Sequence, residues 1–121
     1  MISETLDKVR VLYASKNFDA ALSELDEYEK QHELTTEMLL LKGRLIQLSE
    51  SGERSLSEAK ECFLIALRQD NENINVLLEI GWICISVLGE VEEGRGYFSK
   101  AIEKCSALSA EATRGLESSR E

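Results

Sequence analysis

The sequence predicts an all-α fold, and three observations support this. The 121 residues include no proline, although average usage is about 5%. The strong helix formers Ala, Leu, Glu and Lys dominate long stretches. Apolar residues recur at spacings of three and four, as in Leu22, Leu25 and Tyr28, whereas no segment alternates long enough to form a half-buried strand.

Turn-forming residues divide the chain into about seven helices. We expect helices near residues 3–15, 18–32, 36–49, 56–69, 74–88, 91–105 and 109–119. The expected breaks lie at Lys16-Asn17, 33–35, 49–55, 70–73, Gly89 and Ser106.

Three of these helices have recognisable starts. Thr35 or Thr36 and Asn73 can accept hydrogen bonds from backbone amides of the helices that follow them. Ser55-Leu56-Ser57-Glu58 has the pattern of a capping box, in which the Ser55 hydroxyl accepts from the Glu58 amide and the Glu58 carboxylate reaches back to the Ser55 amide.

The chain contains an internal repeat of helix pairs. Gly43 and Gly81 are 38 residues apart, and Phe63 and Phe98 are 35 apart, as are Ala66 and Ala101. The best copy reads Leu77-x-x-Ile80-Gly81-x-x-Cys84, then Gly94-x-x-x-Phe98-x-x-Ala101. The middle copy reads Leu39-x-x-Lys42-Gly43-x-x-Ile46, then Ala59-x-x-x-Phe63-x-x-Ala66, and the first copy is degenerate. This arrangement resembles the tetratricopeptide repeat, whose small and aromatic residues at these positions form a packing pattern.

The resemblance implies a right-handed α-α superhelix of about seven antiparallel helices, forming one domain over residues 1–121. Its repeats would span about 3–34, 36–72 and 74–106, and a capping helix at 108–119 would cover the last repeat. The sequence departs from the family in two ways: about four extra residues occur around 51–54, and the proline that usually ends a repeat is absent.

Charge and composition argue against several classes of function. The net charge is −9, which cannot supply the cationic stripe that binds nucleic acid. No apolar run approaches the roughly 20 residues of a membrane span, and the first residues lack the apolar core of a signal peptide, so we expect no membrane contact and a cytoplasmic location. The odd number of cysteines, without a CxxC pair, fits a reducing compartment.

The sequence also predicts that the protein is not an enzyme and holds no cofactor or metal. The single histidine, His32, lies at an expected helix end and has no serine or cysteine partner nearby in sequence. No phosphate-binding loop or metal-binding motif occurs. Cys84 occupies a position that the repeat usually buries, which favours a core thiol.

Binding of another protein is the leading hypothesis. The resemblance implies that a second stripe on each first helix lines a concave groove for a peptide or amphipathic helix. These residues are Leu6, Arg10, Tyr13, Leu40, Arg44, Gln47, Asn75, Leu78, Trp82 and Ile85. Some family members clamp a terminal carboxylate with lysines and asparagines on this side. The stripe has no lysine and only one asparagine, Asn75, so we do not expect such a clamp. Because residues 75–88 are apolar almost all round, we expect Leu78, Trp82 and Ile85 to be covered. The cover would be a groove ligand, the C-terminal helix, a neighbouring side chain or a homodimer partner.

An alternative hypothesis starts from the acidic surface. Glu24, Asp26, Glu27, Glu29, Glu90, Glu92 and Glu93 would create a field that steers a basic partner. In this case the chain would be an immunity protein or a secretion chaperone that masks the basic partner. Its binding would weaken steeply with salt, whereas groove binding would not.

Overall fold

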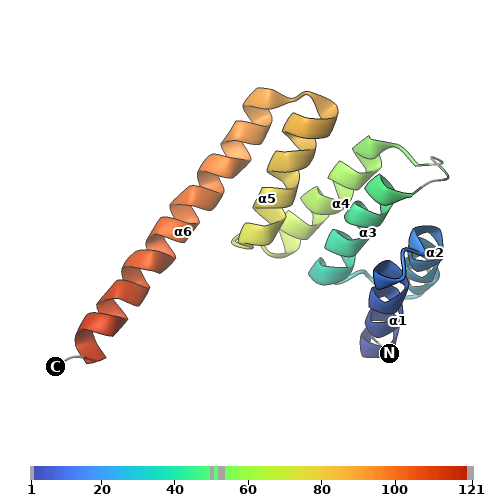
Figure 1. Ribbon diagram of the computed structural model, residues 1–121, viewed down its shortest axis with the longest axis horizontal. Coiled ribbons are helices and arrows are strands. Elements are labelled where there is room, and N and C mark those ends of the chain that lie inside the picture. Colours follow the sequence, from blue (N-terminus) through green and yellow to red (C-terminus); the bar gives the residue numbers. More distant parts are fainter. Residues whose placement is uncertain (1, 50, 52–53, 120–121) are drawn as a thin grey trace. The chain divides into compact units, whose positions relative to one another are not determined.

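The computed structural model describes residues 2–49, 51 and 54–119, which are all-α and contain no strand (Figure 1). The helices are α1 (Ile2–Ala14), α2 (Phe18–Glu29), α3 (Thr36–Leu48), α4 (Leu56–Gln69), α5 (Ile74–Trp82), the π-helix η1 (Ile83–Leu88) and α6 (Val91–Ser119). They form two compact units, residues 1–71 and 72–121. The predicted all-α class is therefore confirmed.

The helix starts are those that the sequence predicts. The side chains of Thr35, Ser55 and Asn73 each accept a hydrogen bond of 3.2 Å from the backbone amide three residues later. Each bond satisfies one of the amides that a helix leaves without a partner in its first turn. The second half of the predicted capping box is replaced, because the Glu58 carboxylate pairs with Arg54 at 3.1 Å.

The first unit consists of two helical hairpins, α1 with α2 and α3 with α4, which pack together through α2 and α3. Its core includes the fully buried side chains of Val9, Leu25 and Phe63. A Cβ atom built on Gly43 would lie only 2.3 Å from Cε1 of Phe63. Glycine at position 43 therefore lets α3 approach the Phe63 ring of α4 closely.

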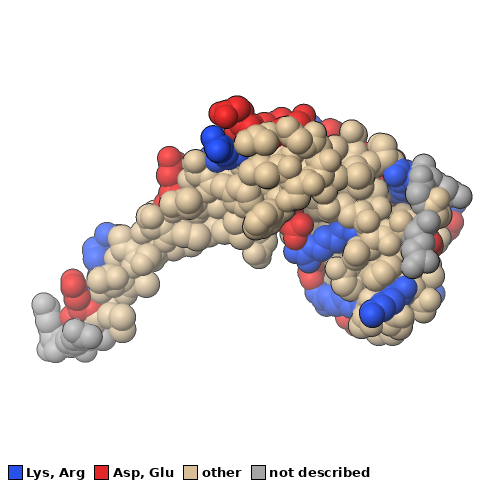
Figure 2. All heavy atoms as spheres, turned by 45° about the horizontal axis from the view of Figure 1, so that its top comes forward, with Lys and Arg blue, Asp and Glu red and all other residues tan. Residues whose placement is uncertain are grey.

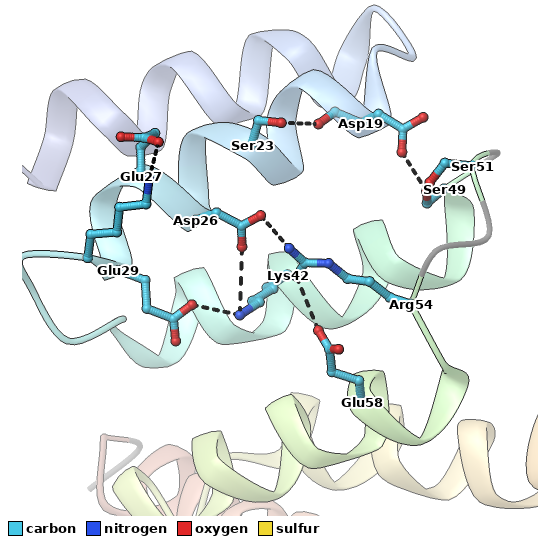
Figure 3. Close-up of polar contacts among 11 residues, drawn as sticks. Asp19, Ser23, Asp26, Glu27, Glu29, Lys42, Ser49, Ser51, Arg54 and Glu58 are labelled. Atoms are coloured by element: carbon cyan, nitrogen blue, oxygen red, sulfur yellow. Dashed lines mark hydrogen bonds and ion pairs between the residues drawn. The ribbon is translucent and has the colours of Figure 1, made fainter.

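A chain of ion pairs links α2, α3 and α4 in this unit (Figure 3). The mostly buried Lys42 lies 2.7 Å from Glu29 and 4.0 Å from Asp26. Asp26 also binds Arg54, which in turn pairs with Glu58. The loop that makes the middle repeat longer than its neighbours is thus tied to α2, although its Gly52 and Glu53 lie outside the described residues.

The second unit is a hairpin of α5 and η1 against α6 (Figure 1). The Phe98 ring packs on Gly81, where a built Cβ would lie 2.9 Å from Cζ. Gly94 on α6 faces Ile85 and the Gly81 carbonyl in the same way. Both units therefore contain a glycine-on-phenylalanine contact between paired helices, at the positions where the sequence repeats.

The segment predicted as one helix over 74–88 changes from an α-helix to a π-helix at Ile83. Residues 83–88 form a π-helix, and the amides of both Gly89 and Glu90 donate to the Cys84 carbonyl. Gly89 has φ of 71°, in the left-handed region that favours glycine, so it ends the helix without strain. The predicted break at Gly89 is confirmed, and the wider helical turn before it is a feature that the sequence analysis missed.

The predicted break at Ser106 and the separate helix at 109–119 are wrong. α6 continues from Val91 to Ser119, and its C-terminal half extends beyond the start of α5 in Figure 1. A serine costs only a few tenths of a kcal/mol inside a helix, and the neighbouring Cys105, Ala107 and Leu108 offer no stronger breaker. All described side chains from Cys105 to Ser118 are exposed, so residues 108–119 do not cap the second unit as predicted. Among the described residues, no helix has the length and hydropathy needed to cross a bilayer.

Candidate functional site

The ten predicted groove residues are distributed over both units. Those of the first unit are Leu6, Arg10 and Tyr13 on α1 and Leu40, Arg44 and Gln47 on α3. Those of the second unit are Asn75, Leu78 and Trp82 on α5 and Ile85 in η1. Each group occupies one side of its helix, since the spacing of three and four residues matches the helical period.

The apolar members in the first unit are mostly covered. Leu6 is 8% exposed and Leu40 is 9% exposed, so both belong to the core rather than to an open surface. Tyr13 is half-buried and packs edge-on against Phe18, with ring centroids 5.8 Å apart. These three side chains hold helices together and leave little apolar area for a ligand.

The polar members in the first unit already have partners. Arg10 forms an ion pair with Glu37 of α3 and a longer one, 3.7 Å, with Asp7. Gln47 donates to the Gly43 carbonyl at 3.4 Å. Arg44 is half-buried and also interacts within the chain. An acidic ligand group would therefore have to compete with Glu37 for Arg10.

The second unit presents an open apolar surface on α5. Trp82 is 60% exposed and Leu78 is 37% exposed, and the two lie one helical turn apart. Asn75, one turn before Leu78, is also exposed. We call Asn75, Leu78 and Trp82 the α5 face.

The orientation of the Trp82 ring is set from α6. Phe98 packs edge-on against the indole, with centroids 5.2 Å apart and planes at 79°. The same Phe98 ring lies on Gly81, the residue before Trp82, so the glycine positions the phenylalanine and the phenylalanine supports the tryptophan. Ile85 is half-buried against Gly94 and serves packing between η1 and α6.

A pocket of about 390 Å³ in the first unit was not foreseen from the sequence. It is lined by Glu29, His32, Glu33, Leu34, Leu39, Ile65 and Gln69. Gln69 donates to the Leu34 carbonyl and accepts from Thr36, while Glu29 pairs with Lys42. His32 packs on Tyr28, with ring centroids 4.7 Å apart. Through these contacts the polar side chains around the pocket stabilise the connection between α2 and α3.

The cysteines differ in environment. Cys62 and Cys84 are buried, whereas Cys105 is exposed. Burial raises the pKa of the Cys62 thiol to about 11, so this thiol stays protonated and unreactive at neutral pH. The predicted core location of Cys84 is confirmed. Cys62 belongs to the core as well.

One group of potential metal ligands occurs in the part of the chain that the structure describes. The Cys84 thiol and the carboxylates of Glu90 and Glu93 have ligand atoms within 4.8 Å of one another. Both acids are exposed at the start of α6, where negative charge stabilises the N-terminal end of a helix. Their position is explained by the helix alone.

The acidic residues that motivate the alternative hypothesis are largely paired inside the chain. Glu24 binds Lys8 at 2.9 Å, Glu27 binds Lys30 at 2.7 Å, and Asp26 binds Arg54. Their charge is partly compensated locally.

Comparison of the sequence with protein-family models gives no match, and no curated protein is significantly similar to it.

Proposed function

We propose that the chain is a non-enzymatic protein-interaction module that binds a peptide or a helix of a partner protein through the α5 face. In this proposal its helix pairs stack as tetratricopeptide-like repeats in one domain, with a right-handed superhelical course and a concave groove, and it acts in the cytoplasm. The observation that carries the proposal is the indole of Trp82, which is 60% exposed on an apolar helix.

The energetics favour Trp82 as a binding residue. Covering the open part of an indole removes on the order of 100 Å² of largely apolar area from water, which contributes about 2–3 kcal/mol. Tryptophan is also enriched among the few residues that carry most of the free energy of an interface. Because Phe98 already supports the ring, a ligand would not have to order it at full entropic cost.

Leu78 and Asn75 extend this surface along α5. An apolar ligand residue on Leu78 and Trp82, with a polar or backbone group beside Asn75, suits either an amphipathic helix or an extended peptide. Arg10 and Arg44 are the proposed cationic contacts of the first unit. Arg10 would exchange Glu37 for an acidic side chain of the ligand, which limits its net gain.

The test uses Trp82 as its own reporter, because the chain contains a single tryptophan. Peptides selected by display against the folded protein are titrated while the tryptophan emission is recorded. We expect a blue shift on binding. In a label-based assay, Trp82→Ala should weaken the same peptides by at least about 2 kcal/mol, roughly 30-fold.

Val11→Ala is the matched control, since Val11 is 67% exposed on α1, outside the proposed site. Circular dichroism must show that all variants remain helical. Equal affinity of the selected peptides for wild type and Trp82→Ala would overturn the proposal. Selection of basic ligands only, whose binding disappears with added salt and survives Trp82→Ala, would establish the acidic masking function instead.

A further inference from the structure

The long helix α6 carries one continuous stripe of apolar and small residues. The stripe comprises Gly94, Phe98, Ala101, Cys105, Leu108, Ala112 and Gly115, at alternating spacings of four and three. This is the heptad spacing of a helix that packs along its length against another helix. Ile102 and Leu116 border the stripe on one side.

The first half of the stripe is occupied within the second unit. Gly94 faces Ile85, Phe98 lies on Gly81, and Ala101 is only 3% exposed. The helix that fills this half is the antiparallel segment of α5 and η1 (Figure 1). Its glycine opposes the large Phe98 ring, so a large residue faces a small one across the contact.

The second half of the stripe continues in register but is exposed. Cys105, Leu108, Ala112 and Gly115 are all exposed, Leu108 to 57%. The bordering Ile102 and Leu116 are 66% and 62% exposed. Figure 2 shows the far part of α6, at the left of the view, as mainly uncharged surface with scattered acidic and basic groups. A fully solvated extension gains nothing from three large apolar residues on one side, whereas a helix-packing surface requires them.

We propose that this half of α6 binds the same half of a second copy, in antiparallel orientation. Two copies of α6 can repeat the packing seen within the second unit, in which a large residue lies opposite a small one. With the two-fold axis beside Ala110, Leu108 opposes Ala112 of the partner subunit and Cys105 opposes Gly115 of the partner subunit. Ile102 then lies beside Leu116 of the partner subunit. Each contact occurs twice by symmetry, as an isologous interface demands.

The charges near this axis make a distinctive prediction. Glu111 flanks the stripe and would face the partner's Glu111 across the axis, so like charges oppose the pairing. Lys104, whose Nζ lies 3.9 Å from a carboxylate oxygen of Glu72, is farther along α6 from the two-fold axis than Glu111 is. Added salt should therefore strengthen this dimer, and Glu111→Gln should strengthen it several-fold at low salt.

Gly115→Cys tests the register directly. A built Cβ at Gly115 meets nothing within 4 Å, so the change is tolerated. The new thiol would oppose Cys105 of the partner subunit, and mild oxidation should give disulfide-linked dimers. The matched control is Gly96→Cys, because Gly96 is equally open but lies on the opposite side of α6. It should give only background crosslinking.

Sedimentation up to about 0.5 mM, a range that includes dissociation constants well above micromolar, tests the association without any crosslink. We expect reversible dimers that Leu108→Glu weakens at least tenfold and Ala110→Glu, on the outer side, leaves within about twofold. Monomers throughout, together with equal crosslinking of Gly115→Cys and Gly96→Cys, would overturn the proposal and leave the face to a different protein. Efficient crosslinking of wild type through Cys105 alone would overturn the antiparallel orientation.

Discussion

The contact between Gly43 and Phe63 predicts that Gly43→Ala destabilises the first unit, although alanine is the better helix former. The added Cβ would lie 2.3, 2.5 and 2.9 Å from three carbons of the Phe63 ring, whereas unstrained carbon contacts are about 3.5–4.0 Å. Phe63 is 0% exposed, so the ring must move by more than an ångström inside a packed core.

The magnitude follows from two opposing effects. Overpacking of a core costs about 1–3 kcal/mol, and overlap with three ring atoms indicates the upper part of that range. Replacing a helical glycine with alanine contributes about 1 kcal/mol in the other direction. The net expectation is a loss of about 1–2 kcal/mol in the free energy of unfolding. For a chain of this size the midpoint would fall by roughly 4–8 °C.

Thermal and urea unfolding followed by circular dichroism measure the effect, and other glycines of the chain provide controls. Gly96→Ala meets nothing within 4 Å and should stabilise the protein by up to about 1 kcal/mol. Gly81→Ala should fall between the two, because its Cβ lies 2.9 Å from the end of a Phe98 ring that is only half-buried and can shift.

A double variant sharpens the test. Phe63→Leu removes the ring, so Gly43→Ala should cost clearly less in the Phe63→Leu background than in wild type, by at least about 1 kcal/mol. A Gly43→Ala protein as stable as wild type, beside a Gly96→Ala protein that gains its expected stability, would show that the Phe63 ring does not resist the added Cβ. Simple addition of the effects of Gly43→Ala and Phe63→Leu would show the same.

Three further predictions concern a turn, the ion-pair chain and a buried thiol. Lys16 has φ of 64°, so Lys16→Gly should relieve backbone strain and raise stability by up to about 1 kcal/mol in urea unfolding. Asp26→Asn, which removes the carboxylate partner of Arg54, should cost about 1 kcal/mol, whereas Glu27→Gln in an exposed pair should change stability by less than about 0.5 kcal/mol. The pKa of Cys62 is about 11 in the folded chain against an ordinary value of 9.0, so the unfolded state loses its proton first and stability should fall between pH 9 and 11. This loss should be smaller in Cys62→Ala when both proteins are unfolded in urea across that range, and identical slopes would contradict it.

The sequence predicted those features that depend on neighbours along the chain. Helix starts at Thr35, Ser55 and Asn73 follow from hydrogen bonds to an amide three residues away, and all three are present. The repeat spacing matched Gly43 with Gly81 and Phe63 with Phe98 as equivalent positions of a packing pattern. In the structure each phenylalanine ring packs on the glycine of its own helix pair, because a close helix contact needs a small residue opposite a large one. The break at Gly89 was predicted from the glycine itself, and its φ of 71° is in the left-handed region that glycine adopts readily.

Features that depend on more distant parts of the chain were missed or misjudged. The π-helix at Ile83–Leu88 has no local signature, since its residues are ordinary apolar helix residues. The break placed at Ser106 relied on a weak signal that helix propensity on both sides overrides. The pocket beside His32 requires three helices to meet, and periodicity within one helix does not report this.

The candidate binding residues show that sequence periodicity predicts the direction of a side chain but not its exposure. Leu6, Leu40 and Leu78 hold equivalent positions in the predicted stripe, yet the first two are 8% and 9% exposed and the third is 37% exposed. Periodicity gives the direction of a side chain around its helix axis, whereas exposure depends on whether another element covers that direction. For α5 the sequence held an additional signal, because a helix that is apolar on nearly all sides has more apolar surface than one packing face can cover. That excess separates Leu78 and Trp82 from Leu6 and Leu40, and it makes Trp82 the residue whose substitution tests the proposed function most directly.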